Sequence, residues 1–125
     1  MAYESPQMTI TLPAASDLSA KQFRFVTVDG DGKVGLSSDD GSSIGVLQNK
    51  PEADQAATIC IFGVTKVYVG TTGALDYGSI VSSEANGAAK IQDSGAYRLG
   101  IALEDSSAAG DIISILFSGV NGSTV

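Results

Sequence analysis

Histidine and tryptophan are absent from this chain and cysteine occurs once, so several common kinds of functional site are excluded at the outset. Without histidine there is no serine–histidine or cysteine–histidine nucleophile pair, and the commonest general base at neutral pH is missing. One cysteine forms neither an intramolecular disulfide nor a thiolate metal cluster. We therefore expect a protein that is not an enzyme and that has no cofactor and no metal site.

The reactive side chains that remain are expected to have structural roles. Cys60 lies in Thr-Ile-Cys-Ile-Phe, where a small buried apolar residue is the expected role and a reactive thiol is not. The carboxylates occur mostly in turns beside glycine and serine, which favours solvated side chains over a catalytic acid–base pair.

Two glycine-rich patterns resemble ligand sites but are better explained as one turn. Gly30-Asp-Gly-Lys-Val-Gly35 fits the dinucleotide-binding spacing, yet the Leu-Ser-Ser-Asp-Asp-Gly that follows does not sustain the helix which that site requires. Asp29-Gly-Asp-Gly-Lys33 begins like a calcium loop, but lysine replaces the third oxygen ligand and no glutamate closes the loop. Asp-Gly and Asn-Gly steps supply the positive φ angles of a hairpin turn, which is the structure we expect here and at Glu84-Ala-Asn-Gly87.

Charged residues are scarce, and most of them are acidic. They make up 17% of the chain, and 14 acidic against 7 basic residues give a net charge of −7. The basic residues are scattered singly, so no basic patch offsets repulsion by a phosphate backbone. Apolar runs are far shorter than the roughly 20 residues that span a bilayer, and the N-terminus lacks a signal-peptide pattern. We expect no nucleic-acid partner, no membrane partner and no export by a signal peptide.

The residues that are abundant indicate β-structure. Met8-Thr-Ile-Thr-Leu12 alternates apolar residues with threonine, as in a strand with one buried face. Further strands are expected from short runs of apolar and β-branched residues, which glycine-containing turns separate, and no long helical pattern occurs. The chain is therefore predicted to be all-β, a small sandwich or barrel of about ten short strands. Expected strands include residues 23–28, 33–37, 44–46, 57–62, 64–69, 99–101 and 112–117.

An internal duplication is visible as one pattern that recurs 55 residues further along the chain. Phe25-Val26 recurs as Ile80-Val81, and Ile44-Gly-Val46 recurs as Leu99-Gly-Ile101. By the same spacing, Phe62 recurs as Phe117 in the second copy. Apolar and glycine positions persist while surface positions change, as expected of two structurally equivalent halves.

The chain is expected to form one domain. We predict an N-terminal arm with the first strand over residues 1–12, a single β domain over 13–119 and a flexible tail over 120–125. Within the domain, the pseudo-repeats are predicted to span residues 25–62 and 80–117.

An ordered series of segments resembles one protein family. The series comprises Ser43-Ile-Gly-Val-Leu-Gln-Asn-Lys-Pro-Glu-Ala53, Gly63-Val-Thr-Lys-Val-Tyr-Val69, Tyr97-Arg-Leu-Gly-Ile-Ala-Leu-Glu104 and Ala109-Gly-Asp111 with the closing β run. Together they resemble the head decoration, or capsid cement, proteins of tailed bacteriophages over roughly residues 8–119.

The resemblance implies a non-enzymatic structural virion protein that binds the outer surface of an expanded phage capsid and stabilises it. It implies the major capsid protein as partner, a homo-oligomer with a trimer favoured, and synthesis in the host cytoplasm. The N-terminal arm is our candidate for capsid or subunit contacts, through Tyr3, Met8, Ile10 and Leu12. The alternative is that Met8, Ile10 and Leu12 pack inside their own domain. Two alternatives stay open, a small ligand-binding or glycan-binding β module and a tail-associated virion subunit.

Overall fold

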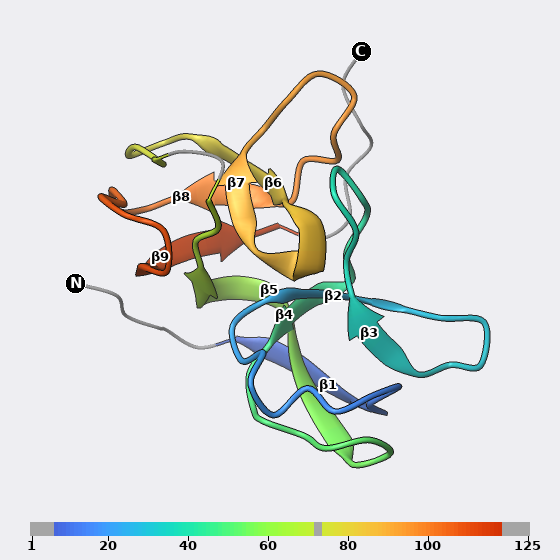
Figure 1. Ribbon diagram of the computed structural model, residues 1–125. Helices are drawn as coiled ribbons and strands as arrows, with labels where there is room; N and C mark the ends of the chain where they lie inside the picture. Colours follow the sequence, from blue (N-terminus) through green and yellow to red (C-terminus); the bar gives the residue numbers. More distant parts are fainter. Residues whose placement is uncertain (1–6, 72–73, 119–125) are drawn as a thin grey trace.

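A computed structural model describes residues 7–71 and 74–118 as a curled antiparallel sheet (Figure 1), which confirms the all-β prediction. Nine strands and one short 3-10 turn, η1, make up the regular structure of these residues. The elements are β1 (Met8–Pro13), β2 (Phe25–Val28), β3 (Val34–Leu36), β4 (Gly45–Leu47), β5 (Ala56–Tyr68), β6 (Ile80–Ser83), η1 (Ala85–Gly87), β7 (Ala89–Ile91), β8 (Gly100–Ala102) and β9 (Ile112–Phe117).

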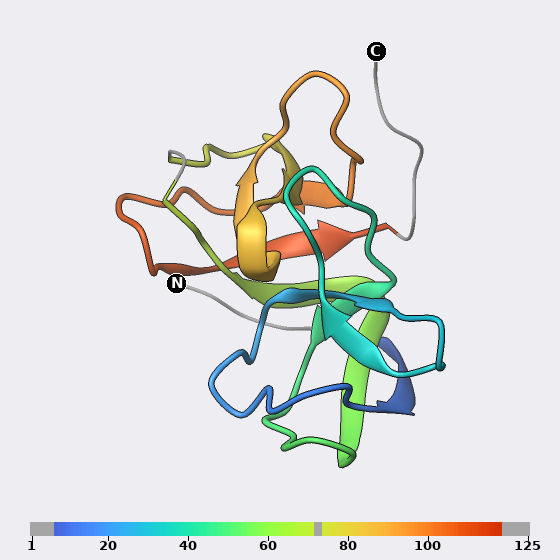
Figure 2. The same ribbon diagram turned by 45° about the vertical axis from the view of Figure 1, so that its right-hand side comes forward.

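Strand β5 is the longest element and connects the two halves of the molecule. The strand order is β3-β2-β4-β5-β9-β8-β6-β7, with β1 also paired to β5. The first part of β5 pairs with β1 and β4, whereas the part from Gly63 to Tyr68 pairs with β9. Separate strands were predicted over 57–62 and 64–69, but Gly63 adopts φ 124° and the chain continues through it as one strand. Figure 2 shows β5 bending as it passes from the lower lobe into the upper one.

The two halves have the same strand pairing. Val26 lies opposite Leu36 and Gly45 in the first half, and Val81 lies opposite Ile91 and Gly100 in the second, each 55 positions later. Backbone hydrogen bonds that lie outside the β-ladders also recur at equivalent positions of the two halves. The hairpin turns at 29–33 and 84–88 confirm the predicted turns, and Gly32 and Gly87 share φ values of 76° and 74°.

The equivalence begins earlier than the predicted repeat start at residue 25. Leu12 of β1 lies opposite Ala57, just as Val67 of β5 lies opposite Ile113. Strand β1 is therefore the counterpart of the second part of β5. We call residues 8–62 unit 1 and residues 63–118 unit 2, and Figures 1 and 2 show them as the lower and upper lobes.

The last strand of each unit does not follow the predicted spacing. Val46 lies opposite Cys60, but its counterpart Ile101 lies opposite Leu116, so the spacing has grown to 56 residues. The cause is the loop 103–111, which is one residue longer than the loop 48–55. The expected match of Phe62 with Phe117 is therefore wrong by one position, and the side-chain face reverses with it. Phe62 is 53% exposed whereas Phe117 is fully buried.

Each unit has its own hydrophobic core. The unit 1 core contains Val26, Val34, Leu47 and Ile59, closed by Ala14 and Leu18 from the segment after β1. The second core consists of residues from 67 to 117 and also includes Phe25 and Val46 of unit 1. One face of unit 1 is thus buried against unit 2. The Cys60 side chain is buried, as expected.

The predicted division into arm, domain and tail stays a prediction. Strand β1 pairs along β5 over residues 8–13, while residues 1–6 and 119–125 lie outside the described part of the chain.

Two equivalent glycines allow close approach of neighbouring strands, and replacing them tests the packing of both units. A Cβ atom at Gly45 would collide with the Cys60 carbonyl, and one at Gly100 would collide with the Leu116 carbonyl. We expect Gly45→Ala and Gly100→Ala each to lower the free energy of unfolding by about 1–3 kcal/mol, because the obstructing atoms are backbone. Urea titration followed by circular dichroism measures the change.

Gly35→Ala is the matched control. Gly35 also lies in a strand, but a Cβ atom there would meet nothing within 4 Å. Its substitution should change the free energy of unfolding by less than about 0.5 kcal/mol. Equal losses in all three variants would contradict the close-approach explanation.

Candidate attachment surface and polar junction

Strand β1 lies at an edge of the sheet and carries three of the four predicted contact residues. Within residues 7–71 and 74–118 it pairs with β5 alone, so its other edge is open to a further strand. Met8, Ile10 and Leu12 lie on β1, whereas Tyr3 lies outside the described residues. An open edge offers backbone hydrogen bonds to a partner and side chains on either side of it.

The most exposed apolar side chains of this region are Met8 and Phe62. They lie opposite each other in the β1–β5 pairing and are 61% and 53% exposed. Sequence reasoning missed Phe62 because the 55-residue spacing matched it with the core residue Phe117. The signal that would have identified it is the one-residue difference between the loops 48–55 and 103–111, which became measurable only once the strand bounds were known.

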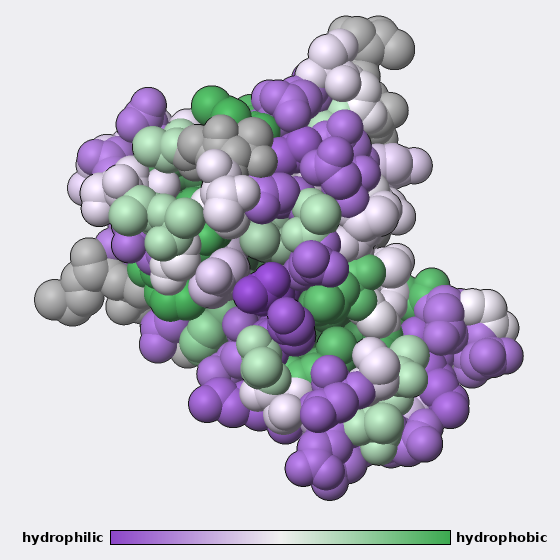
Figure 3. Space-filling model, viewed as in Figure 1, coloured by the Kyte–Doolittle hydropathy of each residue, from purple (hydrophilic) through white to green (hydrophobic). Residues whose placement is uncertain are grey.

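Ile10 and Leu12 have different surroundings from Met8. Ile10 lies opposite the buried Ile59 and is itself 38% exposed. Leu12 is half-buried and packs against the core of its own unit, so it does not form part of the exposed surface in the way that Met8 does. We define the β1 surface as Met8, Ile10 and Phe62 together with the open edge of β1. Figure 3 shows one face of the molecule as mostly polar, with apolar side chains gathered in small areas.

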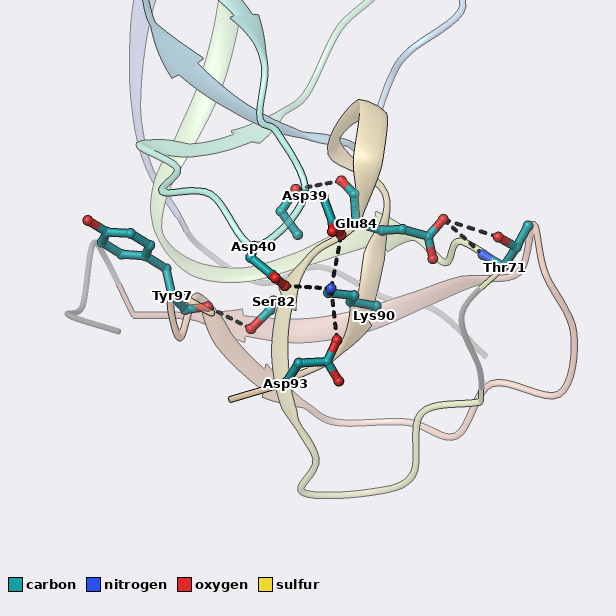
Figure 4. Close-up of polar contacts among 9 residues, drawn as sticks. Asp39, Asp40, Thr71, Ser82, Glu84, Lys90, Asp93 and Tyr97 are labelled. Atoms are coloured by element: carbon teal, nitrogen blue, oxygen red, sulfur yellow. Dashed lines mark hydrogen bonds and ion pairs between the residues drawn. The ribbon is translucent and has the colours of Figure 1, made fainter. Parts of the chain in front are cut away.

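A second feature of the molecule, this one polar, lies where the two units meet. We call it the polar junction. The Lys90 ammonium of β7 lies 2.9 Å from Asp39, 2.5 Å from Asp40 and 3.0 Å from Asp93 (Figure 4). Asp39 and Asp40 come from the β3–β4 loop of unit 1, and Asp93 follows β7 in unit 2. The Lys90 side chain is only 4% exposed, so the cation is held between the units with three carboxylates around it.

Electrostatics keep Lys90 charged. Burial by itself would lower the pKa of Lys90, but the hydrogen bonds that its ammonium donates to Asp40, Asp39 and Asp93 outweigh this effect and raise that pKa well above its usual range. A lysine nucleophile or base needs a lowered pKa, so Lys90 is unsuited to either role. Its three donors match its three carboxylate partners.

Backbone hydrogen bonds fix the same junction. The Asp40 amide donates to the Ser83 carbonyl at 2.9 Å, and the Tyr97 amide donates to the Asp40 carbonyl at 3.3 Å. The Ser82 hydroxyl donates to the Tyr97 carbonyl at 2.6 Å (Figure 4). The contacts of Asp39 and Asp40 with Lys90, and the backbone bonds of Asp40 to Ser83 and Tyr97, all cross from unit 1 to unit 2, so the arrangement is a structural clamp.

The two glycine-rich patterns that resemble ligand sites form a hairpin turn, as predicted. The Asp29 carboxylate accepts hydrogen bonds from the amides of Asp31 and Lys33, and these bonds lower the pKa of Asp29. That carboxylate stabilises the hairpin turn. In the part of the chain that the structure describes, no three His, Cys, Asp or Glu residues are placed to hold a metal ion. The same residues contain no helix of the length and apolarity that crossing a bilayer requires.

Comparison with known proteins supplies the family. The sequence model of the phage cement protein family matches residues 4–117, nearly the whole chain. Among solved structures, the head fiber gp8.5 N base of bacteriophage phi29 is similar, with a TM-score of 0.69 at 14% identity. The match covers 90% of this chain and 95% of that one, so the two share a fold. None of the curated proteins compared with the chain matches it.

Removing the buried cation should loosen the junction. We expect Lys90→Met to lower the free energy of unfolding by about 1–3 kcal/mol, since three carboxylates lose their common partner while their partial exposure lets water replace part of it. Lys33→Met is the control, because the Lys33–Asp54 pair is exposed to solvent and should contribute much less to the free energy of unfolding than the buried cluster. Urea titrations of both variants measure the difference, and a similar small effect at both positions would contradict the clamp.

Alkaline pH should weaken the same clamp. Below about pH 10.4 both the folded and the unfolded chain hold the Lys90 proton, so the contribution of the ion cluster is complete. Above that value the unfolded state loses the proton first, and the contribution falls as pH rises towards the raised folded pKa. We expect the stability difference between wild type and Lys90→Met to shrink between about pH 9 and pH 12, measured by urea titration. A difference that grows with pH would contradict the sign.

Proposed function

Since the chain belongs to the phage cement protein family and is a capsid-associated structural virion protein, we propose that it binds the outer surface of the expanded capsid and stabilises it across subunit joints. The family match over residues 4–117 carries this proposal. Its partner there is the major capsid protein, and synthesis takes place in the host cytoplasm. The role is structural, without a catalytic step.

The architecture suits a protein that resists deformation of a shell. A cement protein adds buried surface across a joint, and it does so only if its own body does not yield first. The shared strand β5, the mixed core and the polar junction hold the two units in one orientation. The net charge of −7 keeps many copies soluble until they dock.

The β1 surface is our candidate for the capsid contact. It combines an open strand edge with the exposed side chains of Met8, Ile10 and Phe62. A strand of the shell that added to this edge would gain backbone hydrogen bonds and would cover these side chains. Tyr3 is proposed to extend the contact from the preceding segment, whereas Leu12 contributes by anchoring β1 to its own core.

Self-association accompanies attachment in this proposal. A homo-oligomer, with a trimer favoured, would present several β1 surfaces to the shell at once and so multiply a weak individual contact.

Binding to purified heads tests the attachment proposal. We expect wild-type protein to sediment with expanded heads and not with unexpanded heads. The double variant Met8→Asp/Phe62→Asp should bind expanded heads about tenfold more weakly or worse, because two apolar anchors are replaced by charges. Tyr77→Asp is the control, since Tyr77 is 72% exposed outside the β1 surface and should be silent.

Several outcomes would contradict attachment. Failure of wild-type protein to bind either kind of head would overturn it, and copurification with tails would favour the tail-subunit alternative. Unchanged head occupancy after deletion of residues 1–7 would remove the preceding segment, with Tyr3, from the contact.

A further inference from the structure

The contact between the two units joins two different surfaces. On unit 1, Phe25 and Val46 are fully buried within the core that unit 2 otherwise supplies, and the Phe25 ring lies 6.3 Å from the Phe117 ring. On unit 2, Gly87 lies so close to the Phe25 carbonyl that a Cβ atom would collide with it. We call the unit 1 side the front surface (Arg24, Phe25, Asp40, Val46) and the unit 2 side the back surface (Ser83, Gly87, Lys90, Phe117).

Because the units are equivalent, each of them has both surfaces. Among the described residues, the front surface of unit 1 packs against the back surface of unit 2, which leaves the other front and the other back surface uncovered by these residues. By strand register and spacing, the unused front surface of unit 2 comprises Ser79, Ile80, Gly95 and Ile101. The unused back surface of unit 1 comprises Val28, Gly32, Gly35 and Ile61.

The unused front surface exposes apolar side chains that are buried in its counterpart. Ile101 is 39% exposed, whereas the equivalent Val46 is fully buried. Ile80 lies directly opposite Ile101, and Leu116 and Val64 continue the same row across β9 and β5. Ile80, Leu116 and Val64 are each only partly buried, so the row forms an apolar strip across four strands.

The unused back surface is open in the same way. Val28 is 38% exposed, whereas the equivalent Ser83 is fully buried and accepts a hydrogen bond from Asp40. A Cβ atom at Gly32 would meet nothing within 4 Å, although Gly32 has the same turn conformation as Gly87. The turn at Gly87 in unit 2 therefore contacts Phe25 of unit 1, whereas the equivalent turn at Gly32 makes no such contact with the described residues.

We infer that these two surfaces bind each other between copies, so that the front surface of unit 2 in one copy packs on the back surface of unit 1 in the next. The occupant of each surface is a second copy of this chain, because the contact within the chain already shows the two surfaces to be complementary in kind. Two different surfaces make a head-to-tail interface, which closes into a ring or continues as a filament. The inference rests on the proposed self-association and supplies its interface.

The contact between copies is weaker than the contact within a chain. Lys90 and Asp40 are replaced by their counterparts Gly35 and Gly95, so no equivalent ion pair forms. The amide of Tyr68 donates to Phe23, whereas its counterpart Pro13 has no amide hydrogen. Association between copies is therefore expected to depend on concentration, while the contact within the chain persists because β5 links the units.

Two variants that each block one surface test the interface. Wild-type protein should show concentration-dependent association in sedimentation velocity between low micromolar and near-millimolar concentrations. Ile101→Glu blocks the front surface and Val28→Glu blocks the back surface, and each variant alone should sediment as a monomer. An equimolar mixture should form a one-to-one dimer and nothing larger, since one intact surface of each kind remains. Thermal unfolding verifies that both variants fold.

Ile112→Glu is the matched control. Ile112 is 39% exposed, as Ile101 is, but the unit 1 residue in its place is the exposed Ala56, so the contact within the chain does not use this position. The control should associate like wild-type protein.

The inference is overturned if wild-type protein is monomeric throughout the series, or if either blocked variant still self-associates. It is also overturned if Ile112→Glu is as disruptive as Ile101→Glu, or if the mixture stays monomeric. No capsid is present in these experiments, so their failure leaves attachment to heads untouched, and failure of head binding leaves the interface between copies intact.

Discussion

The burial of Phe25 and Val46 in the core of unit 2 is the interaction on which the rest of the structure depends. These two side chains lie opposite each other on β2 and β4, and they turn one face of unit 1 into part of the second core. They complete a core that unit 2 otherwise supplies, so the docking of unit 1 adds to the stability of unit 2. Strand β5 links the units covalently, and this contact determines the orientation in which they stay.

The polar junction adds direction to that contact. Apolar burial tolerates sliding, because it depends on area and not on geometry. Lys90 does not tolerate it, since its ammonium group must meet Asp39, Asp40 and Asp93 together inside a nearly closed site. The two contacts therefore divide the work, because the core supplies the stability and the buried ion cluster selects one arrangement of the units.

Much of the fold was predictable because it depends on local chemistry. Asp-Gly and Asn-Gly steps at 29–32 and 84–87 predicted hairpin turns, and both turns occur. The family resemblance was confirmed as well. Strand β5 was not foreseen, because Gly63 read as a break and the tertiary contacts on either side of it keep the strand continuous. The exposure of Phe62 was missed since one added loop residue reverses a strand's faces.

The amino-acid order alone was enough for the strand alternation, the turns and the recurrence of one pattern in two places, because each of these follows from neighbouring residues and from spacing. The amino-acid order did not determine which of two equivalent positions is buried and which is exposed. Phe25 and Ile80 occupy the same place in their units, yet Phe25 is fully buried while Ile80 stays partly open. The difference arises because unit 2 covers a face of unit 1, whereas no third unit among the described residues covers the matching face of unit 2.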